Sequence, residues 1–198
     1  MSLVEEAVAA ILAGRIAVLP TDTVYGVCVD AYREASARRL ARLKGRSEAQ
    51  PTALLAADLE VILDAVPELR GRSAVRAGAL LPGPYTLVLP NPARRFGWLC
   101  GRNPEAIGIR VPDLPAPARA VLDRVGTVAA TSANRHGEPD PARIEDIPEE
   151  IRSRAVVVDA GELPGTPSTV LDLTGPEPTV LREGAASAAE ALERLTAA

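Results

Sequence analysis

The only lysine of the chain, Lys44, lies in a segment whose residue types suit the binding of phosphate oxygens. Residues 43–47 read LKGRS, and every other basic side chain among the 22 lysines and arginines is an arginine. A lysine ammonium is a compact point charge on a flexible stem, whereas a guanidinium is a planar fork. Gly45 lets the backbone come close to a ligand. The alternative is a solvated lysine at a helix end, where its charge complements the helix dipole.

Further polar segments lie at the ends of predicted strands. Residues 21–25 (TDTVY), 131–134 (TSAN) and 165–169 (GTPST) join the polar segment 44–50, and Arg110 and Arg182 also lie near strand ends. Open α/β sheets bind ligands beyond the ends of their strands. These segments therefore form one candidate site that is rich in hydroxyls, amides and cations. For residues 21–25 the alternative is an ordinary Asp or Thr cap on a following helix.

Several kinds of catalytic site do not fit these residues. The only histidine, His136, follows Ser132 too closely to be an obvious base for it, and no oxyanion motif accompanies the pair. A histidine-based metal centre is nearly excluded, and neither a Walker A sequence nor a dinucleotide fingerprint is present. Phosphoryl and nucleotidyl transfer mainly require positioning and charge neutralisation. The residues thus indicate a nucleotide or phosphate site, without naming the second substrate.

The elements that position these residues are expected to form one mixed sheet with flanking helices. Strands alternate with helices early in the chain, whereas the late strands have hairpin spacing, which predicts an α/β (α+β) fold within a single domain, residues 1–198. The predicted strands are 16–19, 52–56, 85–89, 107–111, 127–130, 155–159, 168–172 and 179–182. The predicted helices are 3–12, 34–43, 58–66, 67–79, 116–124, 143–153 and 187–196, with a capping box at Ser2 and Glu5.

Composition favours a protein with an aliphatic core in the cytoplasm. Hydrophobic residues make up 47% of the chain and aromatic residues only 3%, so the core is expected to be aliphatic. The net charge of −4 argues against a globally basic nucleic-acid binder. Cys28 and Cys100 are too few for a disulfide framework and lack the spacing of zinc ligands. No segment predicts a membrane span or a signal peptide, so we expect a soluble, cytoplasmic protein.

Seven short motifs, taken in order, resemble those of the YrdC-like L-threonylcarbamoyladenylate synthase family of the single-domain TsaC type. They are residues 20–26, 44–46, 82–86, 109–112, 132–134, 167–170 and 181–185. The resemblance covers about residues 14–185 and implies a twisted mixed sheet around a large open substrate cavity. It also implies a nucleotidyltransferase that forms L-threonylcarbamoyl-AMP and pyrophosphate from L-threonine, bicarbonate or CO2, and ATP with Mg²⁺. The product would serve the N6-threonylcarbamoyladenosine (t6A37) modification of tRNA.

The resemblance also implies roles for individual residues. The catalytic set would be Lys44, Arg46, Ser132 and Asn134, which would bind the nucleotide together with Gln50 and Arg182. The threonine contacts would be Thr23, Arg110 and Ser168, and no protein metal ligand is expected. Four positions depart from the family pattern and affect mainly the threonine pocket: Ser47, Gln50, Leu55 and Asp140.

Alternative functions and partners remain open from the sequence. A YciO-like paralogue would share the fold without assured synthase activity, although that branch is expected to lack the Ser-x-Asn motif. An RNA-binding module would hold tRNA or double-stranded RNA through Arg38, Arg39 and Arg42, a stripe expected to converge on the Lys44 segment; with this net charge, RNA binding would be secondary. A carbamoyl-transfer domain of the hydrogenase-maturation type would need segments for which this chain has no room. The expected downstream partners are tRNA threonylcarbamoyltransferase proteins.

Overall fold

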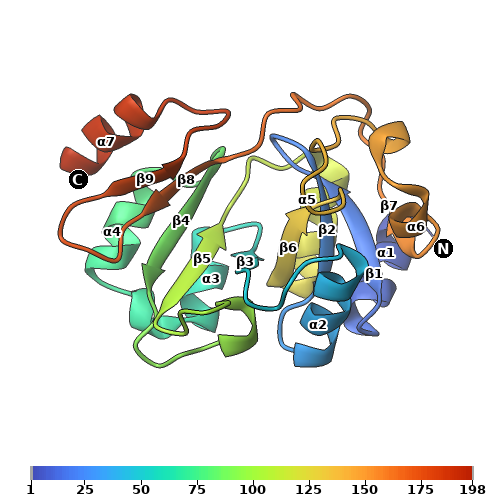
Figure 1. The fold of residues 1–198 in the computed structure, drawn as a ribbon, viewed down its shortest axis with the longest axis horizontal. Coiled ribbons are helices and arrows are strands. Elements are labelled where there is room, and N and C mark those ends of the chain that lie inside the picture. The colour runs from blue at the N-terminus through green and yellow to red at the C-terminus, as the bar shows by residue number, and fades with distance from the viewer. Residues whose placement is uncertain (1, 198) are drawn as a thin grey trace.

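A nine-stranded sheet runs through the whole molecule in the computed structural model, which describes residues 2–197. The strand order is β7-β1-β2-β6-β3-β5-β4-β8-β9, and Figure 1 shows the sheet crossing the molecule from one side to the other. Three pairs are parallel, β1 with β7, β3 with β5 and β4 with β8, and the other five are antiparallel. The predicted mixed sheet is therefore confirmed. The strands are β1 (Ile16–Pro20), β2 (Tyr25–Asp30), β3 (Ala53–Leu55), β4 (Tyr85–Pro90), β5 (Ala106–Arg110), β6 (Val128–Ser132), β7 (Ala155–Val157), β8 (Thr169–Asp172) and β9 (Thr179–Arg182).

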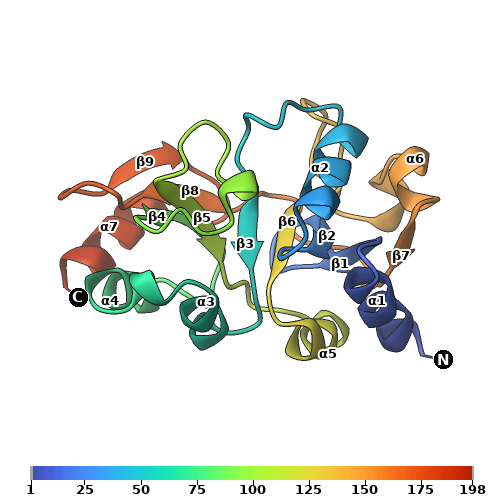
Figure 2. The same ribbon diagram turned by 90° about the horizontal axis from the view of Figure 1, so that it is seen from below.

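Helices flank the sheet on both sides. Figure 2 shows α1, α3, α4 and α5 along one side of the sheet and α2 on the other. The helices are α1 (Leu3–Leu12), α2 (Glu34–Leu43), α3 (Leu59–Ala65), α4 (Arg72–Gly78), α5 (Ala116–Val125), α6 (Glu149–Arg152) and α7 (Ala188–Thr196), with short 3-10 turns η1 (Pro67–Leu69), η2 (Gly97–Leu99) and η3 (Ile144–Asp146). None of the helices in residues 2–197 combines the length and the apolar character needed to cross a membrane.

The N-terminal helix begins where the sequence predicts it. The Ser2 hydroxyl accepts a hydrogen bond from the amide of Glu5, and the Glu5 carboxylate accepts one from the amide of Ser2. This capping box satisfies two backbone donors that have no partner within the helix. Ala7, Ala10 and Ile11 are then buried by the fold, so the predicted helix at residues 3–12 is confirmed, although Leu3 and Leu12 at its two ends are exposed.

Alternation along the strands separates the core from the cavity described below. In β5, Ile107 and Ile109 belong to the hydrophobic core, whereas Gly108 and Arg110 face the cavity. Side chains on a strand point to opposite faces in turn. One strand therefore supplies packing residues and site residues together, and the core contacts hold the site residues in place.

Three sequence predictions about elements are wrong. The helix cap expected in the 20–26 segment is absent: residues 21–24 form a short turn, and β2 starts at Tyr25 and pairs with β1 in a hairpin. The predicted helix 67–79 is interrupted at Gly71, whose φ of 89° is left-handed and breaks it into η1 and α4. The predicted helix 143–153 divides into η3 and α6 around Pro148, which has no amide hydrogen for a helical bond.

Candidate functional site

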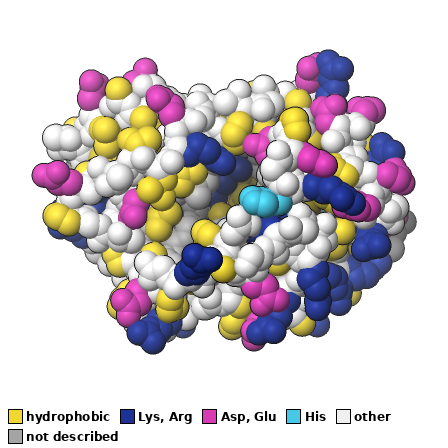
Figure 3. Space-filling view, viewed as in Figure 1, with side chains coloured by type: hydrophobic (Ala, Val, Ile, Leu, Met, Phe, Trp, Pro, Cys, Tyr) yellow, Lys and Arg dark blue, Asp and Glu magenta, His cyan; other side chains and the backbone are white. Residues whose placement is uncertain are grey.

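A cavity of about 480 Å³ opens on one face of the sheet, between the two halves of the molecule. Figure 3 shows it as a hollow near the middle of the face, with cationic side chains on its walls. Small residues form much of its floor: Gly26, Ala53, Ala106, Gly108 and Ala130. A Cβ added to Gly108 would meet its nearest neighbour at an ordinary 3.9 Å, so the backbone itself tolerates a larger residue there. The small residues leave space for a ligand.

Lys44 closes α2 and extends towards the end of β6. Its ammonium donates to the carbonyl oxygen of Ser132 at 2.5 Å and to Oδ1 of Asn134 at 2.8 Å. The Ser132 hydroxyl also donates to Oδ1 of Asn134, at 2.7 Å. The structure thus brings together three of the four predicted catalytic residues, although Lys44 and Ser132 are 88 positions apart. The strand continues through Ser132, so it ends two residues later than the predicted strand 127–130.

Burial changes the acid–base properties of this lysine. Only 4% of Lys44 is exposed. The pKa of the Lys44 ammonium is lowered from 10.5 to about 8, mainly by desolvation and also by the charge of Arg46, while the carboxylate of Asp140 acts in the opposite direction. Burial of a cation without a full counter-charge favours its neutral form. An anionic ligand would therefore stabilise the protonated form of Lys44.

Arg46 and Ser132 line the cavity, whereas Lys44, Asn134 and Gln50 do not. The Arg46 guanidinium donates to the hydroxyl of Thr52, and its buried Nε has no hydrogen-bond partner among the described residues. Desolvation also lowers the pKa of Arg46. Gln50 instead lies with its amide nitrogen 3.2 Å from Nε2 of His136. Gln50, which was predicted to bind the nucleotide, therefore does not lie on the cavity wall.

On the other side of the cavity, Arg110 is held by the β1–β2 hairpin. Its guanidinium donates to the Asp22 carboxylate at 2.5 Å and to the hydroxyl of Thr23. Both side chains of the Arg110–Asp22 pair are only 11% exposed, and Asp22 also accepts from the amide of Asp113. Thr23 is fully buried beneath the guanidinium. Desolvation lowers the pKa of Arg110, and Asp22 counteracts that effect.

Ser168 and Arg182 are neighbours at the β8–β9 side of the cavity. The Arg182 guanidinium donates to the carbonyl oxygen of Ser168 at 2.8 Å, and the Ser168 hydroxyl lies 2.8 Å from that of Thr86. Close backbone packing fixes this corner, because a Cβ on Gly184 would overlap the carbonyl oxygen of Pro167. Arg182, which was predicted to bind the nucleotide, therefore lies against Ser168, which was predicted to bind threonine.

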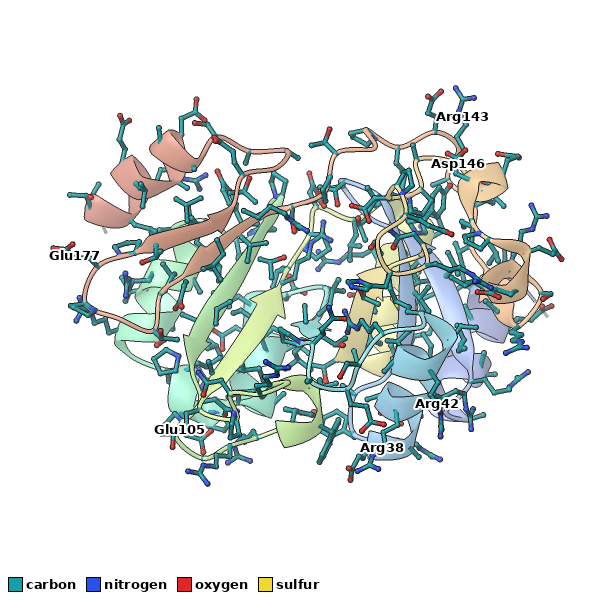
Figure 4. The ribbon with its side chains drawn as sticks, viewed as in Figure 1. Arg38, Arg42, Glu105, Arg143, Asp146 and Glu177 are labelled. Atoms are coloured by element: carbon teal, nitrogen blue, oxygen red, sulfur yellow. The ribbon has the colours of Figure 1, made fainter. Side chains whose placement is uncertain are left out.

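Sequence reasoning missed some residues of the site and misplaced others. Asp22 is the ion-pair partner of Arg110, yet only its neighbour Thr23 was predicted; its place inside the 20–26 motif was the available signal. Asp140 and Leu55 line the cavity at two of the positions that depart from the family pattern. The expected convergence of the α2 arginines on Lys44 is wrong for Arg38, which pairs with Glu34 at 2.6 Å. Figure 4 shows Arg38 near the lower edge of the molecule, and both Arg38 and Arg42 are exposed.

Comparison with known proteins finds relatives over most of the chain. The family model Sua5_yciO_yrdC, described as telomere recombination, matches residues 9–184. A Mycobacterium tuberculosis protein is 35% identical over 183 residues, covering 91% of this chain and 83% of that protein. The threonylcarbamoyl-AMP synthase of Vibrio campbellii is 29% identical over 184 residues, covering 91% of this chain and 98% of that enzyme.

Solved structures of similar proteins share the fold of this chain. Pyrococcus abyssi Sua5 complexed with L-threonine superposes with a TM-score of 0.87 at 29% identity, covering 96% of this chain and 56% of that chain. Escherichia coli YciO superposes with a TM-score of 0.84 at 25% identity, covering 96% of this chain and 92% of that chain. This chain therefore spans little more than half the length of the Pyrococcus protein. Since the family model matches 176 residues, counted from 9 to 184, the chain belongs to the Sua5/YciO/YrdC family.

Proposed function

We propose that this protein is a threonylcarbamoyl-AMP synthase, an adenylyl-transferring enzyme that acts in the t6A modification of tRNA. The observation that carries the proposal is the contact of Lys44 with Asn134 and with the carbonyl oxygen of Ser132, a residue that lines the cavity. Relatives in Pyrococcus abyssi, Bacillus subtilis and Vibrio campbellii carry the name threonylcarbamoyl-AMP synthase. In this reaction L-threonine, bicarbonate and ATP give the adenylate, pyrophosphate and water.

The Lys44 end of the cavity suits the phosphates of ATP. Lys44 is buried and Arg46 is half-buried, and desolvation lowers the pKa of both, so phosphate oxygens would supply the missing counter-charge. As a carbamate oxygen attacks the α-phosphorus, negative charge builds up on the phosphoryl oxygens and on the leaving pyrophosphate. Preorganised cations stabilise such charge without reorganising during the reaction. Ser132 and Asn134 would hold Lys44 in position for this task.

The Arg110 end suits the carboxylate of threonine, with Thr23 and Ser168 nearby. Arginine binds carboxylates through charge-assisted hydrogen bonds. Arg110 already donates from Nη2 to Asp22, but its buried Nε has no partner among residues 2–197. We propose that this free donor contacts threonine, while Asp22 fixes the orientation of the guanidinium. Arg182, which contacts Ser168, would lie where the nucleotide and the amino acid meet.

We propose that Mg²⁺ enters with ATP. Within residues 2–197 no three His, Cys, Asp or Glu side chains are grouped to hold a metal ion. Magnesium commonly keeps several waters and binds substrate phosphates with few protein ligands. The ion would neutralise part of the charge on the triphosphate, while the protein supplies Lys44 and Arg46. A cytoplasmic location and transfer of the adenylate to tRNA threonylcarbamoyltransferase proteins complete the proposal.

The test is synthesis of the adenylate from labelled threonine. The protein is incubated with ATP, Mg²⁺, bicarbonate and labelled threonine, and both the adenylate and pyrophosphate are quantified. We expect pyrophosphate release to require threonine and bicarbonate together, and Lys44→Ala to abolish it. Release that is equally fast without threonine would refute the synthase function.

The fold is shared with YciO, so a paralogue without synthase activity is the second candidate. The same assay separates the two, because such a paralogue would bind nucleotide and yet yield no labelled adenylate. RNA binding as the main function would instead appear as affinity that falls steeply with salt and does not depend on ATP. The intact Ser132–Asn134 contact with Lys44 favours the synthase.

A further inference from the structure

A second group of cations lies outside the cavity, in a groove beside the C-terminal part of α2. The groove has a volume of about 480 Å³. Arg39 and Arg42 project from α2, Arg15 directly precedes β1, and Arg154 directly precedes β7. Three chain segments thus bring four guanidinium groups to one groove, whose lining is completed by Ile16 and Leu43. All four arginines are exposed, so the groove is open to ligands.

None of these four arginines has an ion-pair partner among the described residues, although the charge of Arg154 contributes to the lowered pKa of Glu150. In the part of the chain that the structure describes, no ion pair within 4.0 Å involves any of them. Arg39 donates only to the carbonyl oxygen of Gly14, at 2.9 Å. No acidic residue lines the groove, although the chain has 26 acidic residues and a net charge of −4. Like charges that share a groove repel each other, and an anion would relieve that repulsion.

The surroundings favour a small anion over an extended nucleic acid. Next to the groove, Arg33 pairs with Asp30 at 3.0 Å and Arg38 pairs with Glu34 at 2.6 Å. The positive charge therefore does not continue along α2 as the track that a nucleic-acid backbone requires. No aromatic side chain lines the groove for base stacking. Its volume is in the range of small-molecule sites.

We propose that this groove, defined by Arg15, Arg39, Arg42 and Arg154, binds a small ligand that carries several linked phosphate groups. Guanidinium groups bind phosphate oxygens bidentately, and four of them match a chain of phosphates better than a single one. The groove adjoins the turn that leads to the cavity, because the amide of Gly45 donates to the carbonyl oxygen of Arg42 at 3.1 Å. A ligand held by Arg42 therefore also restrains the turn that carries Lys44, whose ammonium contacts Ser132 on the cavity wall.

Tripolyphosphate is the probe that tests this site. The cavity is first saturated with a non-hydrolysable ATP analogue, and tripolyphosphate is then titrated by calorimetry. We expect one further equivalent to bind. Arg42→Gln combined with Arg154→Gln should weaken that binding by about 100-fold, because loss of each charged hydrogen bond costs about tenfold or more. The control is Arg124→Gln, which removes an exposed arginine of α5 that likewise has no ion pair among the described residues.

Two results would overturn the proposal. One is tripolyphosphate binding that the double variant leaves unchanged, provided that thermal melts show both proteins folded. The other is a short RNA duplex that binds more tightly than tripolyphosphate and loses that binding in the double variant, which would identify the groove as a nucleic-acid surface. The single variants Arg42→Gln and Arg154→Gln supply the same comparison if the double variant does not fold.

Discussion

The lowered pKa of Lys44 predicts that ATP binding weakens above pH 8. Burial, with a further contribution from the charge of Arg46, lowers the pKa of this ammonium from 10.5 to about 8 in the free protein. The difference corresponds to about 3 kcal/mol of lost stability for the charged form. If phosphate oxygens of ATP bind the Lys44 ammonium, only protein molecules in which Lys44 is protonated can make this contact. The dissociation constant of MgATP should therefore depend on pH around 8.

The expected size of the effect follows from the titration of one group. At pH 7 about 90% of a group with a pKa near 8 is protonated, and at pH 9 about 10% is. The dissociation constant of MgATP should then rise by up to about tenfold between pH 7 and pH 9. At pH 8, binding should take up about half a proton per site, because the phosphates raise the pKa of Lys44 in the complex.

Calorimetry of MgATP without threonine measures both quantities. Threonine is omitted because its amine titrates in the same pH range. Proton uptake is obtained from titrations at pH 8 in buffers with different ionisation enthalpies. Two variants supply opposite controls. Arg46→Gln removes the neighbouring positive charge and should move the midpoint to higher pH, whereas Asp140→Asn removes the stabilising carboxylate and should move it lower.

A dissociation constant that stays flat from pH 7 to pH 9, with the same heat in all buffers, would refute this reasoning. It would mean either that the ammonium does not contact the nucleotide or that its pKa remains near 10.5. Lys44→Met separates these possibilities, because it should weaken binding at pH 7 only if the contact exists.

Three further outcomes are expected. Gly108→Leu should abolish ligand binding with a nearly unchanged melting temperature, because the added side chain fills the cavity floor; a large fall in melting temperature would contradict this. Arg110→Ala should destabilise the fold by about 3 kcal/mol in chemical denaturation, since it leaves the Asp22 carboxylate unpaired, and adding Asp22→Asn should restore part of the loss. Lys44→Arg should not restore adenylate synthesis, since a planar fork cannot replace an ammonium that lies 2.8 Å from Asn134; turnover like that of the wild type would show that any cation suffices.

The sequence predicted the contact at the centre of the site but not its surroundings. Lys44 and the Ser132–Asn134 motif were assigned together, and the structure brings them into hydrogen-bond contact. The side-chain direction of Gln50 could not be predicted, because it depends on how the loop of His136 packs across the Lys44 turn. The partner of Arg110 was missed for a similar reason, since β2 was not recognised and the hairpin that delivers Asp22 was read as a turn.

Most of the fold followed from local pattern, and its failures have local causes. The capping box, the amphipathic α2 and the strand at Ile107 all agree with the sequence prediction, because their periodicity matches their burial. The strand β2 is buried from Tyr25 to Val29 on both faces. A fully buried strand shows no alternation, so period-2 analysis has little to detect. The sequence analysis therefore allowed a helix cap at residues 21–25, where the structure has the turn that leads into β2.

The buried cations of the cavity connect the stability of this protein to its proposed ligands. Desolvation lowers the pKa values of Lys44, Arg46 and Arg110. Each such shift means that the charged form of the side chain lowers the free energy of unfolding. A fold selected for stability alone would replace these cations or pair them fully, as Arg110 is paired with Asp22. Ligands that bind only the folded state recover stability, by about 2.7 kcal/mol at 100 times their dissociation constant. The incomplete pairing of Lys44 and Arg46 is therefore best explained by anionic substrates that supply the missing charge.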